Sequence, residues 1–349
     1  MEIKKVFSVV FLLVLTLQGC SYKTTYQPIE YSSMVNDKPR IVEQSNKYIG
    51  VFDKGDRIID PTPLNITEDK VNFTHTDRKF FTVVHKEDTL VVSNREIDFR
   101  KVHNFRDLGG IPTSEGRYTK WGKIYRSGHL HKLNSKEKEK VVSLGITTII
   151  DLRTDKEIGK KPDKTPNSLT YHNYQAYDDS EDMFSKTKKD VLKGKLTPSQ
   201  ADSLVVEFYS LYPTHDIKKV REIVLTILDN TESTLFHCSA GKDRTGMIGA
   251  ILLSILKVEQ QVIIDEYLLS NNYRVEEVSS RMKLAKFGKF LYPKINYQVI
   301  ENFSWIKPMY IQAMFDGIAK EYGSMENYIL NGLQIDKEKQ REYIEKYTQ

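Results

Sequence analysis

The sequence predicts a small all-β segment followed by an α/β domain whose central, mainly parallel sheet is flanked by helices. Short β-type runs separated by turn clusters occupy residues 47–99. Beyond residue 100, apolar β-rich runs at 146–153 and 233–238 alternate with helical patterns, as in sheets that are covered on both faces. The 349 residues, of which 39% are hydrophobic and 28% charged, suffice for two globular domains.

The N-terminus has the layout of a secretory signal. Two lysines precede an apolar run over residues 6–17, and a small-residue site ends at Cys20. The ending LQGC resembles the lipobox of bacterial lipoproteins, in which cleavage before the cysteine leaves a lipidated first residue. We therefore expect a lipoprotein signal peptide over residues 1–19 and an exported protein anchored on the periplasmic or cell-surface side of a bacterial membrane. An ordinary cleaved signal or a short membrane anchor is the alternative, although the run falls short of the roughly 20 apolar residues that a span needs.

Two segments of different composition follow the signal. Residues 20–46 are polar and are expected to form a tether. The runs YIGVF, KFFTVVH and DTLVVS within residues 47–99 then predict a small all-β domain. In size and position this domain resembles the immunoglobulin- or fibronectin-like modules that precede catalytic domains in exported bacterial enzymes.

The α/β pattern fills residues 100–349. The runs ITTIIDLR and STLFHC are apolar and end in polar residues, which is typical of buried parallel strands whose carboxyl ends carry the chemistry. Residues 217–230 have apolar side chains at three- and four-residue intervals, so they predict an amphipathic helix on the sheet. The segment GMIGAILLSILK at 246–257 is apolar on nearly every side and predicts a buried helix.

Cys238 stands where a strand should end and a helix should begin. If Cys20 carries lipid, Cys238 is the remaining thiol of a chain with two cysteines, so no internal disulfide can form. The loop SAGKD separates Cys238 from Arg244, and Gly241 lets its backbone N–H groups converge on one spot. The N-terminus of the helix and Arg244 add positive charge, so the loop from Cys238 to Arg244 is expected to bind a phosphate group. We call this loop the cradle. Such surroundings lower a thiol pKa to roughly 3.5–7.5, so we expect a thiolate that faces a bound phosphate.

The stretch HCSAGKDRTG at 237–246 resembles the HCxxGxxR[ST] signature of cysteine-based protein tyrosine phosphatases, in the bacterial branch that reads HCxAGKDRTG. Further matches occur in the family's order from about residue 100 onward: NFRDLGG, YRSG, DLRTDKE, DEYLLSN and EYGSMENYI. The resemblance implies one phosphatase-fold domain over residues 100–349, a phosphocysteine intermediate, and neither a metal nor another cofactor. In some relatives the substrates extend from phosphotyrosine to phosphoserine, phosphothreonine and phosphoinositides.

The resemblance also implies a role for each residue of the cradle. Cys238 attacks phosphorus, and water then hydrolyses the phosphocysteine. Relatives with a lysine at the position of Lys242 can act on highly anionic substrates such as phosphoinositides, although a solvated loop charge is the alternative. The residues expected to bind the phosphate oxygens are Ser239, Ala240, Gly241, Lys242 and Arg244.

Six residues outside the phosphate-binding set are expected to support or adjoin the site. His237 and Thr245 flank the cradle and are either supporting groups or polar residues satisfied by the loop backbone. Arg106 and Asp107 match a family segment near the site, and a buried salt bridge that holds the loop is the alternative to a direct role. Asp151 and Arg153 follow a strand and are expected to contact substrate.

Expelling the ester oxygen of the substrate needs a proton donor, and many tyrosine phosphatases supply it as the aspartate of a Trp-Pro-Asp run. This sequence has no such run, because Trp121 and Trp305 are followed by Gly122 and Ile306. We favour Asp243, which stays beside Arg244 in every conformation, with Asp151 second. The alternative is that Asp243 only buttresses the loop. Asp178 and Asp179 are further candidates, in the charged segment 177–213 where relatives carry a helical cover. A solvated surface insertion would explain this segment equally well.

Composition weighs against other functions. The net charge of +5 is small and no strong basic cluster stands out, so neither nucleic acid nor a bulk anionic membrane is implied by charge. Arsenate reduction through internal thiols needs more cysteines than Cys238, the one left when Cys20 carries lipid. A non-catalytic phosphate-binding surface module, a pseudophosphatase, would usually lack the cysteine or the arginine, and both are present. The expected partners are a phosphorylated protein or a phosphoinositide, and the membrane through the N-terminal lipid.

Replacing Cys20 by alanine is expected to free the protein from the membrane fraction without reducing catalysis, because the tether is remote from the cradle. Cell fractionation followed by a phosphatase assay on both fractions measures this. Retention of the Cys20→Ala protein in the membrane fraction would contradict the lipoprotein assignment.

Overall fold

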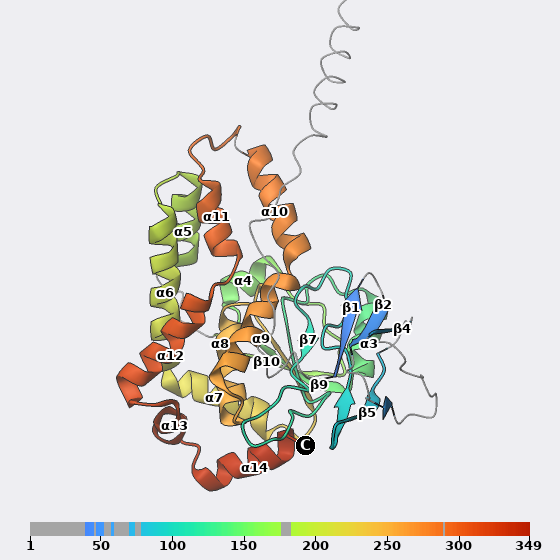
Figure 1. The fold of residues 1–349 in the computed structure, drawn as a ribbon. Helices are drawn as coiled ribbons and strands as arrows, with labels where there is room; N and C mark the ends of the chain where they lie inside the picture. Colours follow the sequence, from blue (N-terminus) through green and yellow to red (C-terminus); the bar gives the residue numbers. More distant parts are fainter. Residues whose placement is uncertain are drawn as a thin grey trace, which may run out of the picture.

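A computed structural model describes residues 39–44, 47–51, 57–58, 70–73, 78–175, 183–288 and 290–349 (Figure 1). The expected signal peptide, the lipidation site Cys20 and most of the expected tether lie outside these residues, as do Asp178 and Asp179. Within the described part of the chain, no helix combines the length and the apolar character needed to cross a membrane.

The N-terminal strands form two antiparallel three-stranded sheets. The first contains β1 (Arg40–Gln44), β2 (Lys47–Val51) and β4 (Lys70–Phe73). The second contains β3 (Arg57–Ile58), β5 (Phe81–His85) and β6 (Asp88–Val92). The β1 strand lies inside residues 20–46, where the polar composition predicts a tether, so strand structure begins earlier than the pattern indicates.

Residues 78–99 pack directly on the α/β domain. The Arg78 guanidinium contacts the buried Asp107 carboxylate at 2.6 Å. The Trp121 indole N–H donates to the carbonyl of Val91 at 2.7 Å. Ile97 and Phe99, together with residues such as Leu130 and Leu235, form one core cluster. The end of the expected β domain is therefore continuous with the core of the segment that follows.

The central sheet has the strand order β10-β9-β11-β8-β7, and it confirms the predicted mainly parallel α/β sheet. The strands β10 (Thr170–Asn173), β9 (Ile146–Asp151), β11 (Ser233–His237) and β8 (Ile124–Ser127) are parallel, and β7 (Arg106–Asp107) is antiparallel to β8. Because β11 lies between β9 and β8, His237 is in register with both Asp151 and Ser127. The residues that follow these strands therefore meet at one edge.

Helices cover both faces of this sheet. Successive residues of a strand point to opposite faces, so each buried strand contributes side chains to two apolar cores. Ile150 and Phe236 belong to the core cluster that includes α7 (Ile217–Asp229) and α8 (Arg244–Ile255). Their neighbours Ile149 and Leu235 belong to the cluster that includes Val141 of α3 (Ser135–Ser143). The predicted amphipathic helix and the predicted buried helix are both confirmed, since α7 buries its periodic apolar face and α8 is buried almost throughout.

The remaining helices surround this core (Figure 1). Helix α6 packs against α12, and its Tyr209 and Tyr212 are buried, so this part of segment 177–213 is not a solvated insertion. The elements are α4 (Asp155–Lys160), α5 (Met183–Leu192), α6 (Pro198–His215), α9 (Gln260–Asn272), α10 (Val275–Gly288), α11 (Tyr297–Ser304), α12 (Pro308–Tyr322), α13 (Met325–Asn327), the π-helical turn Tyr328–Gly332 and α14 (Lys337–Tyr347).

Candidate active site

The loop between β11 and α8 places Cys238 at the N-terminus of a buried helix. Cys238 is 2% exposed, and α8 begins at Arg244. Gly241 has a φ of +67°, and a Cβ built on it would lie 2.4 Å from the carbonyl oxygen of Ser127. The glycine is therefore required both by the backbone conformation and by the close approach of the loop to β8.

A buried ionic network holds the Gly241 carbonyl of this loop in place. The Gly241 carbonyl accepts hydrogen bonds from Arg126 Nη2 at 2.9 Å and from Asn104 Nδ2 at 2.7 Å. Glu266 of α9 contacts Arg126 Nη1 at 2.9 Å and Arg106 Nε at 2.5 Å, and Arg106 also donates to Asn104 Oδ1. Burial would raise the pKa of Glu266, but the two guanidinium groups hold it at about 2.

This network gives Arg106 the loop-holding role that the sequence left as an alternative, whereas Asp107 acts elsewhere. The Asp107 carboxylate accepts from the backbone N–H groups of Gly109 and Gly122 and contacts Arg78. Burial raises the pKa of Asp107 despite these partners. Asp107 therefore ties the N-terminal segment to the sheet rather than buttressing the cradle.

Glu157 orients the Arg244 guanidinium. Its two carboxylate oxygens accept from Arg244 Nη1 at 2.6 Å and Nη2 at 2.8 Å, and Oε1 also accepts from the Ser239 hydroxyl at 2.6 Å. The Arg244 charge keeps the pKa of Glu157 at about 2 although burial opposes this. The stretch DLRTDKE contains Glu157, but sequence reasoning gave this residue no role.

The surroundings of Cys238 favour the ionised form of its thiol. Burial alone would raise the pKa of its thiol, but the positive charge of Arg244 and the hydroxyl and backbone N–H of Thr245 lower it below the ordinary value. Among the described residues, no backbone or side-chain group satisfies the buried Thr245 hydroxyl by a hydrogen bond. Of the two roles that the sequence leaves open for Thr245, interaction with the sulfur agrees better with these contacts than satisfaction by the loop backbone.

The residues around His237 form a closed network behind the cradle. Arg153 Nη2 contacts Asp151 Oδ2 at 2.6 Å and Asp163 Oδ2 at 2.7 Å, and His237 Nε2 lies 3.1 Å from the same oxygen of Asp163. Asp151, Asp163 and His237 are close enough to ligate a cation, but the Arg153 guanidinium already forms ion pairs with both carboxylates.

The burial of this network bears on the expected substrate contacts. Asp151 and Arg153 are both 0% exposed, and the Tyr171 hydroxyl donates to Asp151 Oδ2 at 2.5 Å. Burial opposes ionisation of Asp151, yet His237 and Arg153 lower its pKa, while Asp151 and Asp163 raise the pKa of His237. Either side chain could contact a bound phosphate only if the network opened, so the geometry favours a supporting role.

Asp243 lies between a lysine and a tyrosine. Its Oδ1 accepts from Lys242 Nζ at 2.7 Å and from the hydroxyl of Tyr209 at 2.9 Å, and Tyr209 accepts from Tyr267 at 2.9 Å. Burial would raise the pKa of Asp243, but Lys242, the Tyr209 hydrogen bond and Arg274 together lower it below its usual value, so the carboxyl is ionised in the unliganded protein. Tyr209 belongs to α6, and no local pattern in the sequence indicates that it contacts the cradle.

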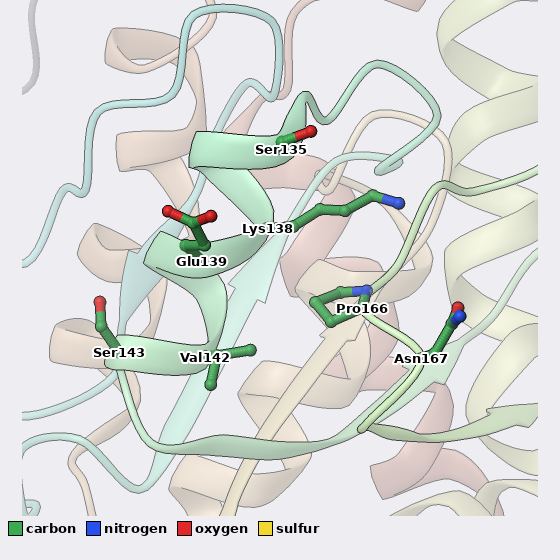
Figure 2. Close-up of a pocket in the computed structure, with 7 residues that line it drawn as sticks. All are labelled: Ser135, Lys138, Glu139, Val142, Ser143, Pro166 and Asn167. Atoms are coloured by element: carbon green, nitrogen blue, oxygen red, sulfur yellow. The ribbon is translucent and has the colours of Figure 1, made fainter.

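A separate shallow pocket of about 550 Å³ lies on the surface of α3 (Figure 2). It is lined by side chains of α3, among them Lys138 and Val142, and by Pro166 and Asn167. It shares no residue with the cradle or with the networks behind it, so the chemistry of the cradle does not extend to it.

Comparisons with known proteins show similarity to phosphatases. A model of the tyrosine phosphatase family matches residues 97–349. A Cupriavidus necator protein named as a tyrosine-protein phosphatase is 28% identical over 70% of this chain and 87% of its own. The triple specificity protein phosphatase PtpB of Mycobacterium tuberculosis is 26% identical over 65% of this chain and 90% of its own. Among solved structures, TpbA of P. aeruginosa is 13% identical over 48% of this chain and 89% of its own, with a TM-score of 0.25, which is too low to support an argument about the fold.

Proposed function

Because the chain belongs to the tyrosine phosphatase family, we propose that the loop from Cys238 to Arg244 is its active site. The protein is a phosphatase that hydrolyses phosphotyrosine. The observation that carries the site assignment is the buried Cys238 thiol, whose pKa Arg244 and Thr245 lower at the N-terminus of α8. A non-catalytic phosphate-binding module is not favoured, since it would have no use for a thiol whose pKa is lowered by its surroundings.

The proposed reaction has two displacement steps at phosphorus. The Cys238 thiolate attacks the phosphoryl group, the bond from phosphorus to the ester oxygen breaks, and the departing oxygen takes a proton. Water then attacks the phosphocysteine, and cleavage of the S–P bond releases inorganic phosphate and restores the thiolate. Loop N–H groups and the Arg244 guanidinium, oriented by Glu157, stabilise the equatorial oxygens in both steps.

We assign the proton transfer to Asp243. Its position in the cradle, next to Arg244, supports the assignment, whereas the Asp151 carboxylate is enclosed by Arg153 and Tyr171. The anionic state of Asp243 in the unliganded protein means that it must gain a proton when phosphate binds. The negative charge of the bound phosphate favours that change, since a nearby like charge raises a carboxyl pKa.

We further propose that the substrate range includes phosphoserine, phosphothreonine or phosphoinositide monoesters. The support is the second cation of the cradle, Lys242, and the similarity to a phosphatase named as having triple specificity.

The protein is proposed to work as an exported lipoprotein anchored through Cys20, on the strength of the lipobox-like LQGC ending.

Replacing Cys238 by serine is expected to reduce turnover by about a thousandfold or more, because a serine hydroxyl stays protonated where the loop stabilises a thiolate. Release of phosphate from a chromogenic aryl phosphate, a phosphotyrosine peptide, a phosphoserine peptide and a phosphoinositide measures this. The wild-type protein is expected to be inhibited by vanadate and insensitive to chelators, and Cys238→Ser is expected still to bind the phosphotyrosine peptide.

More than a trace of activity in Cys238→Ser would remove Cys238 as the nucleophile. If the wild-type protein releases phosphate from the tyrosine peptide but not from the other two biological substrates, the proposed breadth is wrong and the phosphotyrosine activity stands.

Replacing Asp243 by asparagine is expected to slow the cleavage of an alkyl phosphate by about 10²–10⁴-fold and that of a nitrophenyl phosphate far less, because only the poor leaving group needs the proton. Rates across a series of leaving groups measure this, with Asp151→Asn as the matched variant. An equal loss on both leaving groups would make Asp243 a structural residue. If only Asp151→Asn slows the alkyl phosphate much more than the nitrophenyl phosphate, Asp151 is the proton donor instead.

A further inference from the structure

Outside the active site, the C-terminal part of α10 and the turn that follows it expose an unusual set of large apolar side chains. Leu284, Phe287, Phe290 and Leu291 are 71%, 73%, 93% and 73% exposed, and Tyr292 is 44% exposed. We call these five residues the apolar tip. Single exposed apolar side chains are ordinary, but a dense set of them within one short stretch marks a binding surface.

The exposure of the apolar tip does not come from a poorly packed hairpin. Val278 and Met282 of α10 are buried against Trp305 at the end of α11, and Tyr297 and Ile300 pack on them. Figure 1 shows α10 and α11 side by side, with their connection at one end of the molecule, away from the central sheet. The hairpin therefore has its own core, and the apolar tip lies beyond it.

Basic residues surround the apolar tip. The sequence from 278 to 300 contains Arg281 and four lysines but no aspartate or glutamate, and Lys283, Lys286 and Lys294 are exposed. A Cβ built on Gly194 would lie 2.1 Å from the Lys294 carbonyl oxygen, so the turn between α5 and α6 packs here.

That turn has the same electrostatic character. It contributes the exposed Lys193 and Lys195, and Lys195 contacts Asp190 at 3.4 Å. The surface around the apolar tip thus combines aromatic and aliphatic side chains with an excess of lysine.

We propose that the apolar tip inserts into the surface of a membrane that contains anionic lipids. Leucine and phenylalanine side chains enter the boundary between headgroups and acyl chains, tyrosine suits the interface, and the surrounding lysines attract lipid phosphates. A second copy of this chain fits the surface poorly, because it would bring like-charged lysines together. The competing occupant is an acidic protein.

Insertion of the apolar tip would hold the cradle close to the lipid surface. Helix α10 begins at Val275, and its Arg281 interacts electrostatically with both Lys242 and Asp243. The apolar tip begins at Leu284, three residues further along the same helix, and continues into the turn after it. The proposal stands independently of lipidation at Cys20 and of the substrate of the phosphatase.

The test places a fluorophore that senses polarity at the apolar tip. Leu291→Cys is labelled in the full chain with Cys20→Ser and Cys238→Ser, so that one thiol reacts. Leu330→Cys, at a position that is 43% exposed on the π-helical turn, is the matched control. The probes are vesicles of phosphatidylcholine with and without phosphatidylglycerol, and vesicles with brominated acyl chains.

The label at residue 291 is expected to brighten several-fold with phosphatidylglycerol vesicles and to be quenched by brominated chains, while the label at residue 330 does neither. Replacing Lys283, Lys286 and Lys294 by glutamate is expected to abolish the response without lowering the thermal unfolding midpoint, since these side chains are exposed. An unchanged signal at residue 291, or an equal signal at residue 330, would overturn the proposal. A response to polyglutamate but not to vesicles would overturn it in favour of an acidic protein partner.

Discussion

The active site depends on one buried carboxylate, that of Glu266. It lies between Arg106 and Arg126, and through them and Asn104 it fixes the Gly241 carbonyl. Because all three charged groups are almost fully buried, removing one would leave an uncompensated charge, which typically costs about 3–5 kcal/mol. With the Gly241 carbonyl held from below, the loop N–H groups can converge on the phosphate position before substrate arrives.

Two further carboxylates contact charged groups of the loop itself, and they affect different residues. Glu157 takes both terminal nitrogens of Arg244 and the Ser239 hydroxyl, so it fixes the cation that stabilises the Cys238 thiolate. Asp243 is paired with Lys242 and Tyr209 and is ionised in the unliganded protein. The surroundings of the loop thus favour the ionised form both of the Cys238 thiol and of the Asp243 carboxyl before phosphate binds.

The cradle and the sheet could be predicted because both are local. Apolar runs predict β9 and β11, periodicity predicts α7, and the spacing from Cys238 to Arg244 predicts the loop. The roles of Glu266 and Tyr209 could not, because their contacts join segments far apart in the sequence, from α9 and α6. The end of β9 led to the expectation that Asp151 contacts substrate, but Tyr171 and His237, which are distant in the sequence, help to enclose its carboxylate. The net charge likewise conceals the local excess of lysine around the apolar tip.

The pH dependence of Cys238 alkylation by iodoacetamide tests the central claim, that buried support of the loop sets the state of the thiol. The account predicts a wild-type midpoint well below that of an ordinary cysteine. In Arg244→Gln the midpoint should move up toward the ordinary value, because the positive charge that lowers the thiol pKa is removed, with the circular dichroism spectrum showing that the fold is kept. An ordinary midpoint in the wild-type protein, or an unshifted midpoint in folded Arg244→Gln, would contradict it.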